Sequence, residues 1–268
     1  MSYMILKQKH IIMVAAGILA LILLIFFVLR GEDSTVTEAS AAKRQLPIYS
    51  VEKTDKVVSI SFDAAWGNED TQELIEILAK YDIKATFFVV GDWVDKFPES
   101  VKALFDAGHE IQNHSNTHPD LTNLSREQIA EQITSCNEKI KSVTGVSPTL
   151  IRPPYGAYNN TVIETVTSLG MYTIQWDVDS LDWKDLSAEQ IYNRVTSKVN
   201  PGSIVLFHNA ALHTPEALPD IIEALQSDGY DFVKISDLII KKDYTIDHAG
   251  KQHPSSSKAT TSSGVTKK

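Results

Sequence analysis

The sequence predicts an α/β fold in which parallel strands form either a closed barrel or an open, doubly wound sheet. Short apolar runs alternate with segments of helical periodicity, giving about seven β–α units between the two ends of the chain. No glycine-rich phosphate loop follows the first predicted strand, which makes a nucleotide-binding sheet the weaker alternative. A separate apolar run near the N-terminus predicts one transmembrane helix before this domain.

The composition supports one large domain and disfavours nucleic acid as a partner. The chain has 268 residues, of which 43% are hydrophobic, which is enough for a single substantial core. The first 31 residues carry a charge of +3 in a chain whose net charge is −9, so the remainder carries −12. An acidic body lacks the basic patches that bind nucleic acid. Cys136 is the only cysteine, so no intramolecular disulfide forms, and its helical pattern indicates a packing residue.

The N-terminus is predicted to be a signal anchor. Residues 11–29 are an apolar run of 19 residues, long enough to span a bilayer. Lys7 and Lys9 lie in the segment 1–10, which we therefore place in the cytoplasm, with the rest of the chain on the outer face of the cell membrane. The triplet Ala39-Ser40-Ala41 resembles a cleavage site but lies far beyond the run, so an uncleaved anchor is favoured over a cleaved one.

The predicted domain covers residues 56–240, between a linker at 30–55 and a tail at 241–268. The tail is rich in Ser, Thr, Lys and Pro and is predicted to be disordered. Two helices begin with capping-box spacing, Ser125 with Gln128 and Ser187 with Gln190. The predicted strands are 57–62, 85–90, 110–113, 150–151, 172–176, 203–207 and 232–233, and the predicted helices are 71–80, 98–107, 125–143, 161–168, 187–198 and 215–226.

His114 and His118 are spaced as in many divalent-metal sites. Four residues apart, their imidazoles fall on the same side of a helical turn or a tight loop, and zinc is the usual occupant. An isolated pair of this kind is more often two surface histidines. Other polar residues favour the metal reading, because each lies just after or near a strand-like apolar run, where α/β folds gather their chemistry. These are Asp63, Arg152, Asp182 and His208.

Each of these residues has a chemical and a structural interpretation. Asp63, at the end of a strand, is either a base that takes a proton from water or a helix cap. His208 is either an acid that protonates a departing amine or a buried core residue. Arg152 is either a partner that orients a carboxylate or part of a surface ion pair worth little energy.

Five segments, in order, resemble the five motifs of the polysaccharide deacetylases (the NodB-homology, carbohydrate esterase 4 family). The resemblance spans roughly residues 56–240. The first segment most resembles the corresponding motif of the sporulation-linked, membrane-anchored PdaB-like branch. The segments are Ser-Phe-Asp63-Ala-Ala-Trp-Gly, His114-Ser-Asn-Thr-His118, Arg152-Pro-Pro-Tyr-Gly156, Asp179-Ser-Leu-Asp182-Trp183 and Leu206-Phe-His208.

The resemblance implies a distorted (β/α)7–8 barrel and a role for each site residue. His114 and His118 would bind the metal, and Arg152 would pair with Asp63, the base. Asp182 would hold His208 in the correct tautomer and raise its pKa. By the same resemblance the backbone N–H of Tyr155 would stabilise the oxyanion, and Trp183 and Leu206 would line the acetyl pocket, although both also fit plain core packing.

One position departs from the family pattern. Active members usually carry two successive aspartates after the first strand, the second of which binds metal, and here that second residue is Ala64. Catalytic zinc usually has three protein ligands, so its affinity should fall. Three outcomes remain open: two histidines bind the metal with extra water, Asp63 becomes a ligand and loses part of its role as base, or the protein binds glycan without hydrolysing it.

The sequence therefore leads to a primary hypothesis and two alternatives. The first is a hydrolase of amide bonds that removes acetyl groups from a cell-wall or spore-cortex polysaccharide containing N-acetylglucosamine or N-acetylmuramic acid. Its expected metal is zinc, with cobalt or manganese as alternatives, and weak or absent metal binding stays an open alternative because of Ala64. The second is a catalytically impaired glycan-binding protein of the same fold, with a role in sporulation. The third is a glycosidase using Asp63 and Asp182 as its two carboxylates, which fits the arginine and histidine partners less well.

Overall fold

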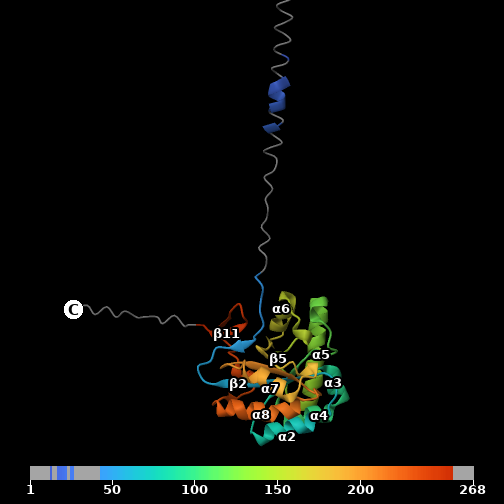
Figure 1. Cartoon of the computed structure of the whole chain (residues 1–268). Helices are drawn as coiled ribbons and strands as arrows, with labels where there is room; N and C mark the ends of the chain where they lie inside the picture. The colour runs from blue at the N-terminus through green and yellow to red at the C-terminus, as the bar shows by residue number, and fades with distance from the viewer. Residues whose placement is uncertain (1–12, 14–16, 23–24, 27–42, 256–268) are drawn as a thin grey trace, which may run out of the picture. The chain divides into compact units, whose positions relative to one another are not determined.

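The computed structural model describes residues 13, 17–22, 25–26 and 43–255, which divide into two compact units at Lys43 and Arg44. Much of the predicted membrane segment 11–29 lies outside these residues. Within the part of the chain that is described, no helix has the length and apolar character needed to cross a bilayer. The fold below is that of the second unit (Figure 1).

Strand β2 (Val57–Ala64) lies in the interior of the main sheet, between β3 (Thr86–Val89) and β8 (Ile204–His208). The strand order is β6-β5-β4-β3-β2-β8-β7, with β9 also paired to β2, and every pairing is parallel. The other strands are β4 (Glu110–Asn113), β5 (Leu150–Ile151), β6 (Tyr172–Thr173), β7 (Val178–Asp179) and β9 (Asp231–Phe232). The order confirms the predicted parallel α/β architecture.

The end strands β6 and β7 are not neighbours in the hydrogen-bonded order, so the barrel is distorted and open on that side. The chain before β2 bridges this opening. Ile48 forms a parallel bridge with Ile174, just after β6, and Ser50 forms an antiparallel bridge with Ser203, just before β8. A segment predicted to be a linker therefore completes the wall of the domain.

The six predicted helices are present. They are α2 (Thr71–Lys80), α4 (Pro98–Asp106), α5 (Arg126–Thr144), α6 (Asn160–Ser168), α7 (Ala188–Thr196) and α8 (Thr214–Ser227). Both predicted capping boxes form, at Ser125 with Gln128 and at Ser187 with Gln190. The sequence analysis missed the short helices α3 (Gly91–Lys96) and α9 (Ile235–Leu238) and the 3₁₀ turns η1 (Leu121–Asn123), η2 (Pro154–Gly156) and η3 (Asp182–Lys184).

The central strands pack one face into the core and leave the other for polar residues. Phe62 is in register with Phe87 on β3 and Phe207 on β8, and its ring lies 4.8 Å and 5.6 Å from theirs. Because side chains alternate along a strand, Ser61 and Asp63 face away from this aromatic cluster. The apolar packing of β2 thus fixes the direction in which Asp63 points.

The linker and tail predictions are wrong for the residues next to the barrel. A second, three-stranded sheet consists of β1 (Ser50–Val51), β11 (Lys251–Pro254) and β10 (Tyr244–Ile246). His253 on β11 hydrogen-bonds Glu52 at 3.0 Å and Asp247 at 2.9 Å. Composition alone missed this pairing because its partners are about 200 residues apart. Residues 256–268 of the predicted tail lie outside the described residues.

Candidate functional site

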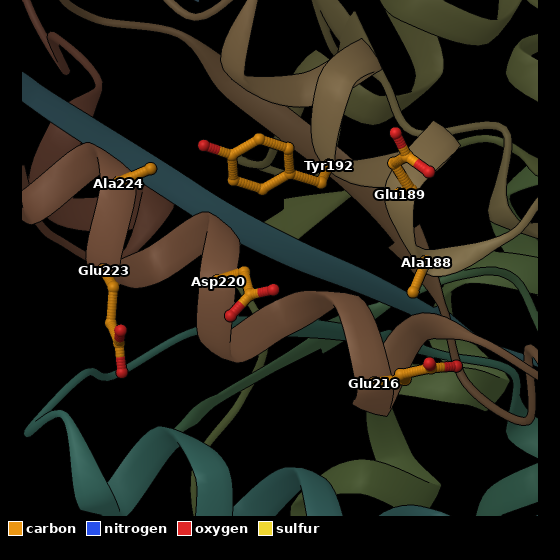
Figure 2. Close-up of a pocket in the computed structure, with 7 residues that line it drawn as sticks. All are labelled: Ala188, Glu189, Tyr192, Glu216, Asp220, Glu223 and Ala224. Atoms are coloured by element: carbon orange, nitrogen blue, oxygen red, sulfur yellow. The ribbon is translucent and has the colours of Figure 1, made fainter.

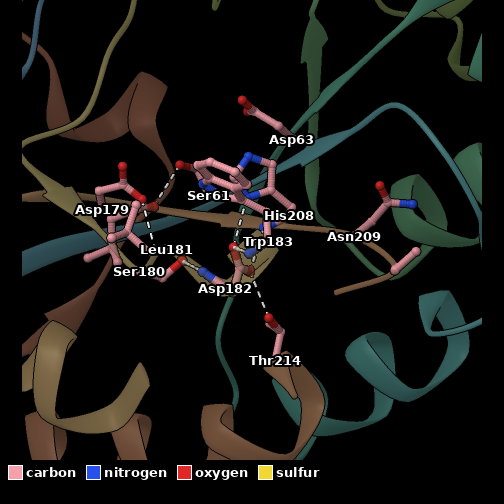
Figure 3. Close-up of polar contacts among 12 residues, drawn as sticks. Ser61, Asp63, Asp179, Ser180, Leu181, Asp182, Trp183, His208, Asn209 and Thr214 are labelled. Carbon is pink, nitrogen blue, oxygen red and sulfur yellow. Dashed lines mark hydrogen bonds and ion pairs between the residues drawn. The ribbon is translucent and has the colours of Figure 1, made fainter. Parts of the chain in front are cut away.

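The six polar residues singled out in the sequence lie at one end of the sheet. Parallel strands place their carboxyl ends at a common edge, where loops can bring side chains together. The structure gives Asp63 at the end of β2, His208 as the last residue of β8, His114 and His118 in the loop after β4, Arg152 directly after β5, and Asp182 in η3 after β7. Hydrogen bonds and ion pairs join them into two groups, one around His114 and one around His208. Figure 3 shows the group around His208.

The two histidines of the first group present their Nε2 atoms to the same point. The ring Nδ1 of His114 hydrogen-bonds the backbone oxygen of Arg152 at 2.7 Å, so Nδ1 carries the proton and Nε2 has a free lone pair. The Nε2 atoms of His114 and His118 are 3.2 Å apart. Two nitrogens on one tetrahedral zinc, each about 2.0–2.1 Å away, are separated by about 3.3 Å. The pair therefore fits two neighbouring ligands of one cation.

Both imidazoles are neutral, as metal ligands must be. Burial lowers the pKa of His118 to about 4, with a further contribution from His114. Burial also lowers the pKa of His114, more than the nearby Asp63 charge raises it. These two side chains would hold a divalent cation. The Arg152 carbonyl orients the His114 ring, as hydrogen-bond acceptors around metal sites commonly do for histidine ligands.

The site supplies no obvious third ligand. Ala64 is buried in the main hydrophobic cluster, and its methyl group has no donor atom. Among the residues that the structure describes, no group of three histidine, cysteine or acidic side chains is arranged to hold a metal. Asp63 lies beside the pair, with Oδ2 3.5 Å from Nε2 of His114. The ligand set is thus two imidazoles with one carboxylate just outside it.

Asp63 is held as a carboxylate by Arg152. The Nη1 of Arg152 donates to Oδ1 of Asp63 at 2.6 Å, and its Nη2 donates to Oγ of Ser61 at 2.8 Å. The guanidinium also lies over the Phe88 ring, 4.2 Å from its centre. Burial raises the pKa of Asp63, but the charge of Arg152 leads the opposing effects, and the net pKa lies below its usual value. The predicted ion pair is therefore buried, not on the surface.

Asp182 holds His208 in the second group, which Figure 3 shows. Its Oδ1 accepts a 2.8 Å hydrogen bond from Nδ1 of His208, and its Oδ2 accepts from the His208 backbone N–H at 2.8 Å. Thr214 and the Trp183 backbone N–H donate to the same carboxylate at 2.7 and 2.9 Å. Burial lowers the pKa of His208, but the hydrogen bond and charge of Asp182 outweigh it and raise the net pKa.

The three predicted substrate-contacting residues lie in different environments. Tyr155 is exposed, and its ring centre lies 4.7 Å from that of His118. Trp183 is also exposed and follows Asp182 directly. Leu206 is buried on β8, in register with Ser61 and two residues before His208. Their roles toward a substrate stay predictions.

Strained backbone is concentrated in the loops of the site. Among the described non-glycine residues with positive φ, six lie in the loops that follow β4, β5, β7 and β8. Such conformations cost energy and persist where surrounding contacts enforce them, often at functional sites. The six are Ser115, His118, Tyr155, Leu181, Asp185 and Ala210.

The sequence analysis missed several residues that support the site. Ser61 and Thr214 are fully buried and hydrogen-bond Arg152 and Asp182. Trp66 is exposed, with its ring centre 5.4 Å from that of His118. Ser61 and Trp66 stand inside the first motif and were available to inspection, whereas nothing in the sequence pairs Thr214 with an aspartate 32 positions earlier.

A pocket of about 550 Å³ between α7 and α8 lies apart from these residues (Figure 2). None of the predicted site residues lines it. Its wall carries Tyr192 and four carboxylates, from Glu189, Glu216, Asp220 and Glu223. It lacks the histidines and arginine needed for the predicted chemistry, so the strand-end cluster remains the candidate site.

Comparison with known proteins identifies the family. A family model described as polysaccharide deacetylase matches residues 50–174. The chain is 35% identical to the peptidoglycan-N-acetylmuramic acid deacetylase PdaA of Bacillus subtilis, covering 70% of this chain and 73% of that one. It is equally similar to the peptidoglycan-N-acetylglucosamine deacetylase PgdA of Listeria monocytogenes, over 74% of this chain but only 42% of that one. It spans 60% of the uncharacterized protein YlxY of Bacillus subtilis, at 35% identity.

Solved structures agree in fold and include both active and inactive proteins. The peptidoglycan N-acetylglucosamine deacetylase Bc1960 superposes with a TM-score of 0.70 at 32% identity, over 72% of this chain and 92% of that one. BA3943 of Bacillus anthracis, a pseudoenzyme, superposes equally well at 35% identity, over 77% and 72%. A BA3943 mutant with restored enzymatic activity also matches, with a TM-score of 0.70, 38% identity and coverage of 73% and 72%. The chain belongs to the polysaccharide deacetylase family, the carbohydrate esterase 4 or NodB-homology group of amide hydrolases with a distorted α/β barrel.

Proposed function

We propose that this protein is a metal-dependent deacetylase that removes N-acetyl groups from peptidoglycan, acting on N-acetylglucosamine or N-acetylmuramic acid. The observation that carries the proposal is a pair of prepared proton-transfer groups at the ends of the neighbouring strands β2 and β8. Asp63 is held by Arg152, and His208 is held by Asp182. Relatives named as peptidoglycan deacetylases, PdaA and PgdA among them, support the choice of substrate.

The first proton transfer is assigned to Asp63. Its Oδ1 is engaged by Arg152, whereas Oδ2 points toward the histidine pair. A lowered pKa keeps the carboxylate ionised and able to take a proton from the attacking water. A divalent cation held by His114 and His118 would polarise the amide carbonyl and acidify that water.

The second proton transfer is assigned to His208. The raised pKa favours the imidazolium near neutral pH, and Nδ1 is occupied by Asp182, so Nε2 is the atom that delivers a proton to the departing sugar nitrogen. The backbone N–H of Tyr155 is the proposed donor to the oxyanion, in a loop fixed by its left-handed conformation. The products are acetate and a free amine.

A second candidate function is supported by Ala64. A site with two metal ligands binds a cation less tightly than one with three, and BA3943, of the same fold, is a pseudoenzyme. The alternative is a glycan-binding protein that uses the same surface without hydrolysis. The retained ion pair of Asp63 and the retained dyad of His208 favour catalysis, since binding alone requires neither.

The remaining proposals concern location and biological setting. The apolar segment 11–29 and the lysines before it support a single-pass anchor with the barrel on the outer face of the cell membrane, where peptidoglycan lies. The motif Ser61-Phe-Asp-Ala-Ala-Trp-Gly67 supports the sporulation-linked PdaB-like branch. Labelling of engineered surface cysteines in intact cells tests the orientation, since a barrel on the outer face reacts with an impermeant reagent.

The activity is tested by two assays run in parallel. The purified protein is stripped of metal, supplied with zinc, cobalt or manganese, and incubated with peptidoglycan glycan strands. A deacetylase releases acetate without forming new reducing ends, whereas a glycosidase forms reducing ends. Release of neither product, together with retained polymer binding, would favour the glycan-binding alternative over the proposed function.

A further inference from the structure

We propose that Trp66 forms a binding site for a sugar ring adjacent to the one that carries the acetyl group. The protein would then take a glycan chain of several sugars, not an isolated amino sugar. This inference rests on the proposed function, because it identifies part of the substrate of the same site.

Trp66 is exposed without an evident structural reason. It is 61% exposed, whereas Trp93 in helix α3 is 2% exposed and packs in the core. Within residues 44–255, the exposed aromatic side chains are Trp66, Tyr155 and Trp183. All three follow the carboxyl end of a sheet strand, β2, β5 and β7, so they gather at the end of the sheet that holds the site. Exposed apolar surface concentrated in one place usually marks a binding surface.

The loop that carries Trp66 is held in place on both sides. Asn209, directly after β8, accepts a hydrogen bond from the Ala65 backbone N–H at 3.2 Å and donates to the Gly67 backbone oxygen. The indole N–H of Trp93 donates to the same Gly67 oxygen at 2.8 Å. The backbone is therefore fixed immediately before and after Trp66. An aromatic side chain on a fixed backbone loses little conformational freedom when a ligand covers it.

The position of the indole relates it directly to the reacting groups. The Trp66 ring meets the His118 ring edge to face, with centres 5.4 Å apart and planes at 65°. Trp183, another of the three exposed aromatic residues, follows the aspartate that holds His208. One indole thus lies beside the histidine pair, and the other belongs to the residue that follows Asp182 of the His208 dyad. A sugar bound for deacetylation between these groups would have its chain neighbours beside the indoles.

The chemistry of a pyranose fits such a surface. One face of the ring presents several C–H bonds, while the hydroxyl groups point outward and stay hydrated. The flat, electron-rich face of tryptophan accepts the apolar face of the sugar, and its polar edge tolerates surrounding water. The stacking contact itself involves no charge, so the affinity lost on removing Trp66 should depend on the number of sugar rings and not on salt.

The test measures binding to the metal-free, full-length protein, so that no hydrolysis occurs. The probes are N-acetylglucosamine, a single sugar ring, and a peptide-free peptidoglycan tetrasaccharide, with affinity measured by calorimetry. We expect Trp66→Ala to weaken tetrasaccharide binding by about three- to tenfold, as for loss of one aromatic contact, and to leave N-acetylglucosamine binding within twofold of wild type. Trp66→Phe, which keeps a flat ring, should restore most of the lost affinity.

A control variant and two outcomes make the test decisive. Val146→Ala removes a comparably exposed apolar side chain (56%) in the loop before β5, at the amino end of a strand, and should bind both probes as wild type does. Equal tetrasaccharide affinity of wild type and Trp66→Ala, or no binding of either probe by wild type, overturns the proposal. If length-dependent binding is present but acetate release is absent, the Trp66 site stands and the deacetylase function is removed.

Discussion

The two histidine groups of the site differ in how completely the surrounding chain equips them. The Asp182 carboxylate beside His208 accepts four hydrogen bonds, two of them from backbone N–H groups. The imidazoles of the His114–His118 pair have, among the described residues, one hydrogen bond to a group outside the pair, to the Arg152 carbonyl, and Ala64 stands where the family usually has a carboxylate ligand. The His208 group, the proton-transfer half of the site, is therefore complete. The His114–His118 pair, the metal half, lacks a ligand.

This difference indicates that the two halves respond to different constraints. A buried ion pair often contributes no more to stability than well-packed apolar residues would, so stability alone does not explain two such pairs at one end of the sheet. Metal affinity, in contrast, can fall substantially while a site still works if the cation is abundant. The account therefore predicts large losses from changes in the proton-transfer groups and a gain from completing the metal half.

The largest expected effect is that of Asp63→Asn. The amide cannot take a proton from water, so acetate release should fall by about a hundred- to ten-thousandfold, the usual contribution of general base catalysis. The measurement is kcat/KM for acetate release from peptidoglycan glycan strands at saturating metal. Asp177→Asn is the matched control, because Asp177 hydrogen-bonds Ser203 and Ile204 and has no contact with the site. Unchanged activity of Asp63→Asn would remove the proposed base.

The next effect tests the incomplete half directly. Ala64→Asp adds the missing carboxylate and should tighten zinc binding by about tenfold or more, because catalytic zinc sites usually have three protein ligands. Competition with a chromophoric chelator measures the dissociation constant. Ala65→Asp adds the same charge one position later and should leave it within about threefold, since the charge alone is screened. Equal affinities of wild type and Ala64→Asp would show that position 64 cannot supply a ligand.

A smaller effect concerns proton affinity in the complete half. In Asp182→Asn the acidic partner is gone and burial remains, so the pKa of His208 should move from above its usual value to below it. NMR titration of the imidazole in metal-free protein measures this. His109, whose pKa is lowered to about 4 by burial and by the charge of Lys84, should titrate as in wild type. A His208 pKa that does not fall would mean that Asp182 does not hold its proton.

The same shift has a consequence for stability. A histidine with a raised folded-state pKa stabilises the protein fully below its unfolded pKa of about 6.5, and this contribution is lost as the pH rises through the folded pKa. The wild type should therefore lose this part of its unfolding free energy above about pH 6.5, whereas Asp182→Asn should not. Urea unfolding at a series of pH values compares the two.

The smallest effect is that of Thr214→Val, which removes one of the four donors to Asp182 and keeps the side-chain shape. A hydrogen bond to a buried charged group contributes about 1–3 kcal/mol, so the free energy of unfolding should fall by that amount. Thr165→Val is the matched control, since the buried Thr165 hydroxyl donates to an uncharged backbone oxygen within its helix. A smaller loss for Thr214→Val than for Thr165→Val would contradict the importance of the contact.

Local patterns in the sequence predicted much of the fold and of the site. Alternation around Phe62 predicted β2 and the position of Asp63 at its end, and the capping residues Ser125 and Ser187 predicted two helix starts. The gap at Ala64 was visible because the family motif specifies that position. These predictions succeeded because each depends on residues close together in the chain or on a motif of fixed length.

Contacts between distant segments could not be predicted in the same way. The hydrogen bond of Thr214 to Asp182, the sheet formed by residues before β2 and after α9, and the exposure of Trp66 depend on how the completed fold brings separate segments together. The prediction of a disordered tail is wrong for residues 241–255, which contain strands. Their polar composition also occurs in short strands, and the partner of β11 lies at the other end of the domain.

The most direct test of the account is the rate of acetate release as a function of metal occupancy. Cobalt is added to the stripped protein, and bound metal and released acetate are measured in the same samples. The account predicts a rate that rises with occupancy up to one cation per chain, and a rate at least about a hundredfold lower for His208→Ala at equal occupancy. No acetate from wild type at full occupancy, or equal rates for the two proteins, would contradict it.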